Sequence, residues 1–308
     1  MKKSAILIIL LAFVMAFTAC DFTSGVDITL PPLDDNAVHP DSMTNDSGRV
    51  DETTSAPDDE TTSGGSEEST TGGGEMVTSE ETTAHTGTLE GEYGLVKPSV
   101  AVDKSYFDDT AFIGDSVSLM LKTYALTGAL GKATVFAQGS YGLTNALSQP
   151  LNASDSTHPT YQGTRMYAED AVAACGAKKV YIMLGMNDLV YGVDHAVSSY
   201  ETFISRIKAK SPDVEIFIQS MTPMRNNSSV ASSKLNNDKI KEYNSRLEAL
   251  CRSKGYYFID VQSIMWEDDG SQLRSAYCSD GNSMGLHLTQ AACRAWVDYL
   301  LTHTVKFN

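Results

Sequence analysis

The feature that most constrains the fold of this chain is a regular alternation of short apolar runs with helix-like segments between residues 111 and 300. Polar or glycine-containing turns bound each run, as expected for buried strands. The predicted strands are Ala111–Ile113, Ala133–Ala137, Val180–Leu184, Val214–Ile218 and Tyr256–Val261. Such alternation is typical of a parallel sheet with helices on both faces. We therefore predict an α/β fold, a three-layer α/β/α sandwich around a five-stranded parallel sheet.

Apolar residues recur at helical spacing between these strands. The predicted helices are Val117–Leu126, Arg165–Cys175, His195–Lys208, Lys239–Arg252 and a last helix from Thr289 to Leu300. Sites in open parallel sheets lie at the carboxyl ends of the strands. The loops after the first three strands carry Gly114-Asp115-Ser116, Gly139-Ser140-Tyr141-Gly142 and Gly185-Met186-Asn187-Asp188. We expect all three loops to open on the same edge of the sheet.

The first 20 residues have the pattern of an export signal. Lys2 and Lys3 precede a mostly apolar run from Ala5 to Ala19, which is short for a membrane-spanning helix of ~20 residues. The small residues before Cys20 resemble a bacterial lipobox, although Phe17 is unusual at its first position. We predict a signal peptide over residues 1–20, with Cys20 lipidated at the outer face of the cell membrane. An ordinary signal peptide that releases a secreted protein is the alternative.

Residues 21–97 have the composition of a tether. Of the 39 acidic residues, 18 lie between residues 21 and 95, where Arg49 is the sole basic residue. Such a Thr-, Ser- and Gly-rich segment has too few apolar residues to bury a core, and its like charges extend it. We expect disorder here and a folded domain over residues 98–308.

The net charge of −16 belongs to the tether, because 21 acidic and 20 basic residues remain from residue 96 onward. The folded domain is therefore close to neutral. The absence of a basic stripe argues against a nucleic-acid partner.

Ser116 lies where the first predicted strand gives way to a helix. At such a corner a side chain is exposed at the carboxyl end of the sheet, and the first N–H groups of the helix point towards an anion. A serine nucleophile and part of an oxyanion hole can share this position. The same Gly-Asp-Ser sequence also suits a simple turn in which serine caps a helix, so other parts of the chain must decide.

The order and spacing of the blocks resemble the SGNH/GDSL hydrolase superfamily, over roughly Phe107 to Leu300. Gly114-Asp115-Ser116 matches its first block, Gly139 its second, and Gly185-Met186-Asn187-Asp188 its third. His287-Leu288-Thr289, just before the last helix, matches its fifth. Each block is short, and the specificity lies in their combination. The resemblance implies a flavodoxin-like sheet and hydrolysis of esters.

The resemblance also implies the role of each residue. Ser116 is the expected nucleophile, and the oxyanion donors are the backbone N–H groups of Ser116 and Gly139 with the side-chain amide of Asn187. A glycine at position 139 lets a substrate come close to the backbone. His287 is the expected general base. None of the other histidines lies in the loop directly before the last helix. They are His39, His85, His158, His195 and His303.

One position departs from the family pattern. The family places an aspartate three residues before the catalytic histidine, where this chain has Met284. The nearest acidic residue is Asp280. Either Gly281 and Gly285 let a longer loop fold so that Asp280 reaches the His287 ring, which we favour, or a Ser–His dyad operates with another group that orients the ring.

Four cysteines lie in the folded part of an exported chain, where disulfides are permitted: Cys175, Cys251, Cys278 and Cys293. A Cys278–Cys293 disulfide would close the loop around His287, and buried free thiols are the alternative. The sequence has no Cys-x-x-Cys or His-Glu-x-x-His motif, so we expect neither a metal nor a cofactor.

Three functions fit these observations. We favour a surface-tethered serine esterase that removes acyl groups, above all acetyl groups, from a carbohydrate or cell-envelope polymer. The second is an O-acyltransferase that passes the acyl group to a sugar hydroxyl. The third is a glycan-binding surface lipoprotein without catalysis, which the residue at position 284 alone supports.

Overall fold

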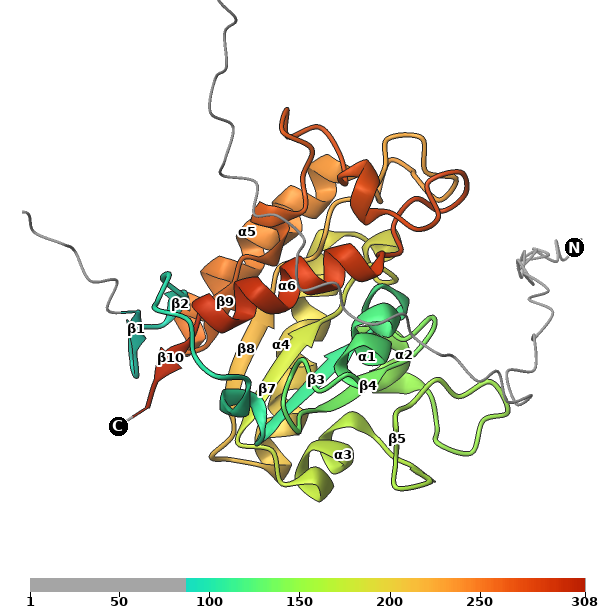
Figure 1. Ribbon diagram of the computed structural model, residues 1–308. Coiled ribbons are helices and arrows are strands. Elements are labelled where there is room, and N and C mark those ends of the chain that lie inside the picture. The colour runs from blue at the N-terminus through green and yellow to red at the C-terminus, as the bar shows by residue number, and fades with distance from the viewer. Residues whose placement is uncertain (1–86, 308) are drawn as a thin grey trace, which may run out of the picture. The chain divides into compact units, whose positions relative to one another are not determined.

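The computed structural model describes residues 87–307 (Figure 1). Its strands are β1 (Thr88–Leu89), β2 (Gly94–Leu95), β3 (Thr110–Gly114), β4 (Thr134–Ala137), β5 (Thr160–Tyr161), β6 (Thr164–Arg165), β7 (Lys179–Met183), β8 (Glu215–Gln219), β9 (Tyr257–Ile259) and β10 (Val305–Lys306). Its α-helices are α1 (Leu119–Ala125), α2 (Leu143–Ser148), α3 (Ala168–Cys175), α4 (Val193–Lys210), α5 (Asn237–Lys254) and α6 (Gln290–Thr302). Its 3₁₀ helices are η1 (Lys104–Phe107), η2 (Ser116–Ser118), η3 (Leu189–Tyr191), η4 (Val261–Ile264) and η5 (Ser275–Tyr277).

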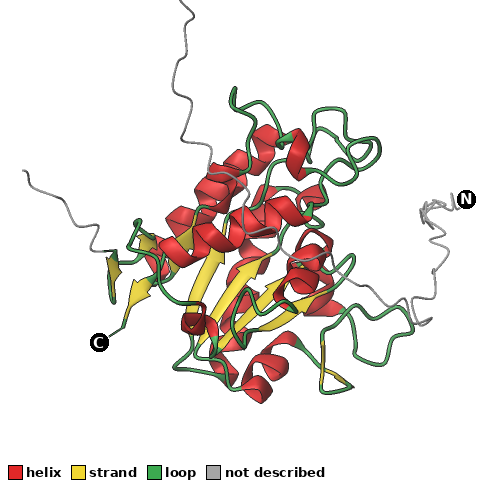
Figure 2. Cartoon of the chain, viewed as in Figure 1, coloured by secondary structure: helices red, strands yellow, loops and turns green. Residues whose placement is uncertain are grey.

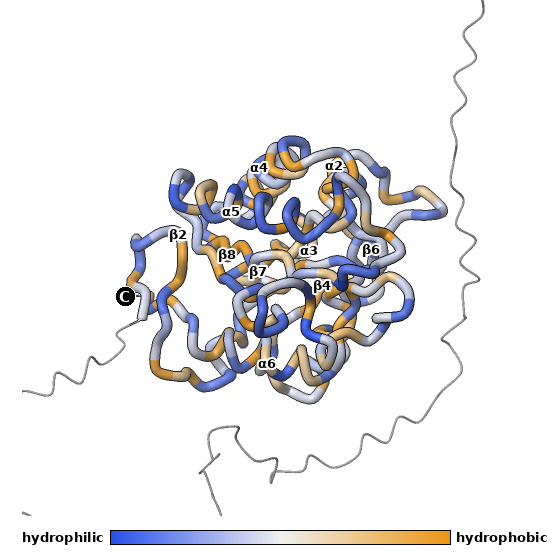
Figure 3. The backbone as a smooth tube through the Cα atoms, turned by 90° about the horizontal axis from the view of Figure 1, so that it is seen from above, coloured by the Kyte–Doolittle hydropathy of each residue, from blue (hydrophilic) through white to orange (hydrophobic). Residues whose placement is uncertain are grey.

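The central sheet has the order β2-β9-β8-β7-β3-β4. All of its neighbouring strands are parallel, which confirms the predicted α/β class. Helices lie on both sides of it, as Figure 3 shows for α2, α4 and α5 on one side and α6 on the other. Helices α1 and α6 pack against each other, and α4 packs against α2, α3 and α5.

Two features of the fold differ from the sequence prediction. The sheet has six strands, because β2 pairs with β9 at one edge, and β1 pairs with β10 in a separate two-stranded sheet. Residues 88–97 therefore belong to the folded domain and not to the tether. Two-residue strands are too short to produce a periodic pattern, which is why the sequence did not reveal them. A helix, α2, also forms in a segment predicted to be loop (Figure 2).

The predicted signal peptide, Cys20 and the tether up to residue 86 lie outside the described residues. Within residues 87–307, no helix combines the length and the apolar character needed to cross a membrane.

An aromatic ladder fixes the register of the central strands. Phe112, Tyr181, Phe217 and Tyr257 are direct neighbours on β3, β7, β8 and β9. Their ring centroids are 5.0, 4.3 and 4.8 Å apart in that order. The exposed fraction of each of these side chains is at most 2%. Because cross-strand aromatic pairs stabilise a sheet beyond the area they bury, this ladder opposes slippage of one strand past another.

This register brings the three predicted loops to one edge of the sheet. Gly114 on β3 is paired with Ala137 on β4 and with Met183 on β7. Ser116 and Gly139 each lie two residues beyond that row, and Asn187 lies four residues beyond it. The loops that carry these three residues therefore leave the sheet side by side at the carboxyl ends of β3, β4 and β7.

Candidate active site

Ser116 lies at a tight corner between β3 and η2. Asp115 caps η2, because its Oδ1 accepts a hydrogen bond of 2.9 Å from the backbone N–H of Val117. The turn folds back so closely that a Cβ at position 114 would collide with the side chain of Ser118. Only glycine fits there, and the result is a half-buried Ser116 at the start of the helical turn.

Asp115 lies beneath this corner and is 1% exposed. Burial raises the pKa of Asp115 to about 7; the nearby Asp188 acts in the same direction, and the hydrogen bond from Val117 opposes both. The Asp115 carboxyl therefore carries a proton for part of the time near neutral pH. This reduces its repulsion of a negative charge that forms beside Ser116.

Hydrogen bonds join the two loops that carry the expected oxyanion donors. The Asn187 side-chain amide donates to the carbonyl of Tyr141 at 2.9 Å. The carboxylate of Asp188 accepts from the backbone N–H groups of Leu143 and Thr144, both at 2.8 Å. Asn187 is exposed, while Asp188 is buried. One N–H of the Asn187 amide is thus used to hold the loop, and the second is left for a ligand.

The surroundings of Gly139 differ from those of the other block glycines. A Cβ at Gly139 would meet no atom within 4 Å, whereas a Cβ at Gly142 would lie 2.9 Å from an Asp188 oxygen. The next residue, Ser140, has a positive φ of 58°, which is uncommon for serine and belongs to the strained conformations that cluster at functional sites. The protein itself does not need glycine at position 139, so the open space there suits the close approach of a substrate.

Asp280 and His287 form a hydrogen-bonded pair. The Oδ2 atom of Asp280 lies 2.7 Å from Nδ1 of His287. The Oδ1 atom accepts from the backbone N–H groups of Leu286 and His287, each at 3.0 Å, and from the thiol of Cys278 at 3.4 Å. Two arrangements were predicted because Met284 occupies the usual position of the aspartate. The structure shows the first of them, a longer loop in which Asp280 reaches the His287 ring.

The chain around Asp280 folds back on itself to make this contact possible. Cys278 and Leu288 form an isolated antiparallel bridge, and the Ser279 N–H donates to the His287 carbonyl at 2.8 Å. Within the loop, Gly285 adopts a φ of +67°. The six residues between Asp280 and His287 along the chain therefore form a closed loop whose two ends lie side by side.

The charge state of Asp280 suits a partner of histidine. Burial acts to raise its pKa, but the hydrogen bonds from the ring and backbone of His287 outweigh that effect and hold the pKa of Asp280 below its ordinary value. Asp280 is therefore ionised at neutral pH. A carboxylate in this position orients the imidazole and stabilises the imidazolium that forms when His287 accepts a proton.

The loop of His287 lies at the same edge of the sheet as Ser116. The segment that follows β8 binds this loop through a hydrogen bond of 2.7 Å from the Arg225 N–H to the Gly285 carbonyl. Helix α6 begins three residues after His287 and packs beside α1, which follows Ser116 (Figure 1). Trp296 of α6 donates to Gln219 at the end of β8 at 2.8 Å, which fixes α6 against the sheet.

Within residues 87–307, the hydroxyl of Ser116 makes no hydrogen bond. Among these residues, the Ser116 hydroxyl is therefore not hydrogen-bonded to His287. A catalytic hydrogen bond between a serine and a histidine commonly tightens only when the substrate is bound. The structure thus brings Ser116, Gly139, Asn187, Asp280 and His287 to one edge of the sheet, and the roles expected for them from the sequence stay predictions.

Two further expectations concern the cysteines and a metal. The four cysteines of the described region are free thiols, so the Cys278–Cys293 disulfide does not form. Across the described region, residues 87–307, no group of three or more His, Cys, Asp or Glu side chains is placed to hold a metal ion.

Two parts of the site were not predicted from the sequence: Asp188 and the segment after β8. The one sequence signal for the role of Asp188 was its place in the third block. An acidic residue next to Asn187 could cap a helix on the neighbouring loop. Nothing in the sequence linked Arg225 to the loop of His287, since the two are 62 residues apart.

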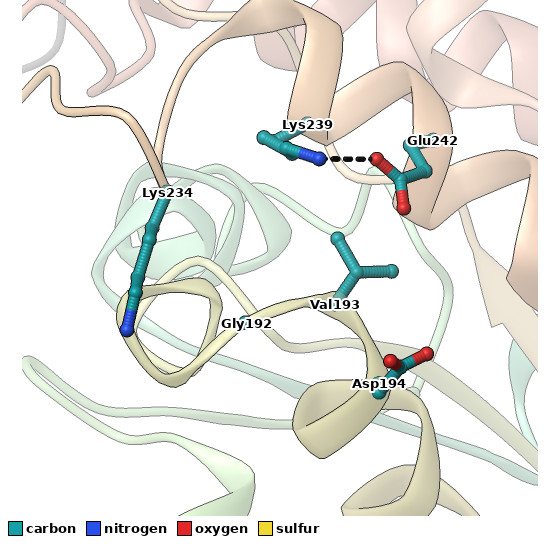
Figure 4. Close-up of a pocket in the computed structure, with 6 residues that line it drawn as sticks. All are labelled: Gly192, Val193, Asp194, Lys234, Lys239 and Glu242. Atoms are coloured by element: carbon teal, nitrogen blue, oxygen red, sulfur yellow. Dashed lines mark hydrogen bonds and ion pairs between the residues drawn. The ribbon is translucent and has the colours of Figure 1, made fainter.

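A polar pocket lies next to the loop that carries Asn187. It has a volume of about 220 Å³ and is lined by Gly192, Val193, Asp194, Lys234, Lys239 and Glu242. Figure 4 shows Lys239 and Glu242 of α5 facing the first residues of α4, with Lys234 on the adjoining loop. Lys239 and Glu242 form an ion pair of 2.7 Å. The charged groups of the pocket thus come from α4, α5 and the loop before α5, and its first lining residue, Gly192, follows Asn187 by five residues along the chain.

The contact between Asp280 and His287 predicts a kinetic effect. We expect Asp280→Asn to lower kcat for ester hydrolysis by about 10²- to 10⁴-fold, because the amide can stabilise the wrong tautomer of His287 and cannot offset its charge. Kinetics on an activated acetate ester would measure this. A decrease smaller than threefold would show that Asp280 does not assist His287 and that a dyad operates.

The two glycines of the first and second blocks predict opposite effects. Gly139→Ala is expected to leave the melting temperature unchanged while it lowers kcat/KM about 10- to 100-fold, because the added methyl group meets only the substrate. Gly114→Ala is expected to lower the free energy of unfolding by about 1–3 kcal/mol, because the methyl group overpacks the corner. Thermal melts and kinetics on both proteins would test this. Equal loss of stability in the two variants would contradict it.

Comparison with known proteins was made at the levels of sequence and structure. No curated protein matches the chain in sequence. A GDSL-like lipase from Bacteroides thetaiotaomicron is 14% identical with a TM-score of 0.48, over 65% of this chain and 89% of that one. The C-terminal catalytic domain of the peptidoglycan O-acetyltransferase A of Streptococcus pneumoniae is 17% identical with a TM-score of 0.39, over 64% of this chain and 92% of that one.

The sequence profile of the GDSL-like lipase/acylhydrolase family matches residues 112–295, which is more than half of the chain. The matched range contains all five residues assembled at the edge of the sheet. The chain therefore belongs to the GDSL-like lipase/acylhydrolase family of serine ester hydrolases.

Proposed function

We propose that this protein is a cell-surface serine esterase that removes short acyl groups, above all acetyl groups, from a carbohydrate or cell-envelope polymer. The observation that carries the catalytic part is the 2.7 Å hydrogen bond between Asp280 and His287, made at the sheet edge where the half-buried Ser116 lies. An imidazole held in this way is prepared to act as a general base.

The reaction follows the chemistry of acyl transfer. His287 Nε2 takes the proton of the Ser116 hydroxyl as Oγ attacks the ester carbonyl. The tetrahedral oxyanion is stabilised by the backbone N–H groups of Ser116 and Gly139 and by the free N–H of the Asn187 amide. His287 then donates its proton to the leaving alkoxide, which gives an acyl-serine. Water attacks the acyl-serine with His287 again as base, and this releases the carboxylic acid and restores Ser116.

The side chains around the site favour an ester substrate that has a short acyl chain and a polar alcohol. Leu119 and Met120, both partly exposed, follow Ser116 in the first turn of α1 and offer a small apolar surface to an acyl group. Beyond the Asn187 loop, the pocket of Figure 4 presents Lys234, Lys239 and Glu242. Side chains of this kind suit the hydroxyl groups of a sugar better than a lipid chain.

The proposed location rests on the sequence of the first 97 residues. A lipid on Cys20 would attach the protein to the outer face of the membrane, and the acidic segment after it would hold the domain away from the surface. A polymer of the cell envelope would then be within reach of the site.

Two alternatives were open on the sequence. The non-catalytic alternative rested on Met284, which stands where the family has an aspartate three residues before His287. The hydrogen bond of Asp280 to His287 argues against it. An O-acyltransferase would use the same acyl-serine and differ only in whether water or a sugar hydroxyl attacks it. Among residues 87–307, no contact favours a sugar hydroxyl over water as the attacking group, so hydrolysis is the proposal.

Kinetics on a series of esters would test the catalytic part of the proposal. The purified chain is expected to hydrolyse p-nitrophenyl acetate faster than the octanoate, and Ser116→Ala is expected to lose at least about 10³-fold of that activity. Acetylated polysaccharides should release acetate. Equal activity of wild type and Ser116→Ala would contradict the proposal, and transfer of acetyl to an added glycan at the expense of free acetate would favour the transferase.

The proposed anchor predicts a change in how the protein partitions. Full-length protein expressed in a bacterium is expected to enter the detergent phase of a two-phase extraction and to carry a diacylglycerol mass on Cys20, because a lipid anchor adds ~0.8 kcal/mol of membrane affinity per buried CH₂. Cys20→Ala should remain in the aqueous phase or retain its signal peptide. An unmodified mature N-terminus near residue 20 in the wild type would show a secreted protein.

A further inference from the structure

A segment far from the catalytic blocks in sequence holds the loop between Asp280 and His287. This clamp segment, residues 225–229, follows β8 and makes four hydrogen bonds to residues 281–285. The Arg225 N–H donates to Gly285 O at 2.7 Å, the Ser229 N–H to Ser283 O at 3.0 Å, the Asn227 amide to Gly281 O at 3.2 Å, and the Ser228 hydroxyl to Met284 O. All four acceptors are backbone carbonyls of the loop.

The clamp segment is itself anchored to the body of the domain. The guanidinium of Arg225 donates to Glu267 at 3.0 Å and to the Leu273 carbonyl at 2.7 Å. Ser228 is buried. The Cβ of Arg225 also lies close to Gly285, because a Cβ added to Gly285 would be 2.8 Å from it. The clamp segment is therefore a fixed surface against which the loop is pressed.

We propose that Arg225 and Ser228 are positioning residues that hold Asp280 in contact with His287. The loop needs such support because it is longer than the three-residue spacing typical of its family, and its tip residues Asn282 and Ser283 are exposed. Its internal bonds run from Ser283 and Gly285 back to the carbonyl of Asp280, so movement of the tip is transmitted to Asp280. A displacement of about 1 Å in a catalytic group can cost a factor of 10² in rate.

The contacts indicate which positions matter. Because the clamp segment binds the backbone of residues 281–285, the side chains of the loop tip can vary with little effect on the catalytic pair. The side chains at positions 225 and 228 cannot, since they supply the anchor and the bond to Met284. The Arg225 guanidinium is bound to Glu267 and Leu273, and Ser228 is buried, so we expect the influence of both residues to run through Asp280. The proposal rests on the proposed esterase function.

The test compares four variants of the full chain: Ser228→Ala, Arg225→Ala, Arg225→Lys and Arg252→Ala. Arg252 is the matched control, because its side chain is exposed and its ion pair with Glu248 lies within α5. Three properties are measured on each: kcat and KM on p-nitrophenyl acetate, the melting temperature, and the downfield proton resonance of the His287 Nδ1–H, assigned by its loss in His287→Gln.

We expect Ser228→Ala and Arg225→Ala to lower kcat about 10- to 100-fold with KM changed less than twofold. The His287 proton resonance should broaden or shift upfield in both, because the bond to Asp280 is loosened. Arg225→Lys should recover part of the kcat of Arg225→Ala, since a lysine can still bond to Glu267 or Leu273. Arg252→Ala should match the wild type in all three properties.

Wild-type kcat and an unchanged His287 resonance in Ser228→Ala would overturn the proposal. So would a loss of kcat that merely follows the melting temperature while the resonance persists. If Arg225→Ala does not fold, Ser228→Ala decides, because it removes one hydroxyl only. An inactive wild type would instead contradict the proposed esterase function, and the resonance would still report whether the clamp segment holds Asp280 and His287 together.

Discussion

The site depends on the parallel register of β3 with β4 and β7. The aromatic ladder of Phe112, Tyr181 and Phe217 holds β3 against β7, and the pairing of β4 with β3 completes the last row of Gly114, Ala137 and Met183. Because side chains alternate between the two faces of a strand, a slip of one residue would send the residues after that row to the wrong side. A buried stack well inside the domain therefore helps to fix where Ser116 and Asn187 lie, and the pairing of β4 fixes where Gly139 lies.

The second half of the site is built differently. Asp280 and His287 come from a long loop that no strand holds, and their contact depends on hydrogen bonds to backbone atoms and on the segment after β8. The turn that carries Ser116 is thus held by packing, while the pair of Asp280 and His287 is held by polar contacts with a neighbouring loop. This arrangement lets the spacing between the acid and the histidine grow without loss of their contact.

The sequence predicted the parts of the structure that follow from periodicity and from short motifs. The alternation of strands and helices was enough to predict the parallel sheet, because apolar runs such as Val180–Leu184 must be buried on both faces. It missed β1 and β2, which have two residues each, and α2, whose helix starts in a loop-like segment and is capped by Asp188 from another loop. Contacts between distant loops leave no periodic signal.

In the site as well, some features could be predicted from periodicity and motifs, and others depend on contacts between loops. The positions of Ser116, Gly139 and Asn187 followed from the strand ends, whereas the contact of Asp280 with His287 depended on how a loop folds, and two readings stayed open. The disulfide between Cys278 and Cys293 was an alternative that spacing permitted, but the thiol of Cys278 turns to Asp280 instead. Such choices are made by three-dimensional contacts that a linear pattern does not encode.

The most direct test of the account is the structure of the protein after reaction with an alkyl phosphonate, which imitates the tetrahedral intermediate. The account predicts a covalent adduct on Ser116 Oγ, with the phosphonyl oxygen within hydrogen-bonding distance of the Gly139 N–H and the Asn187 amide, and His287 between Ser116 and Asp280. An unmodified Ser116, or an adduct whose oxygen points away from both donors, would contradict it.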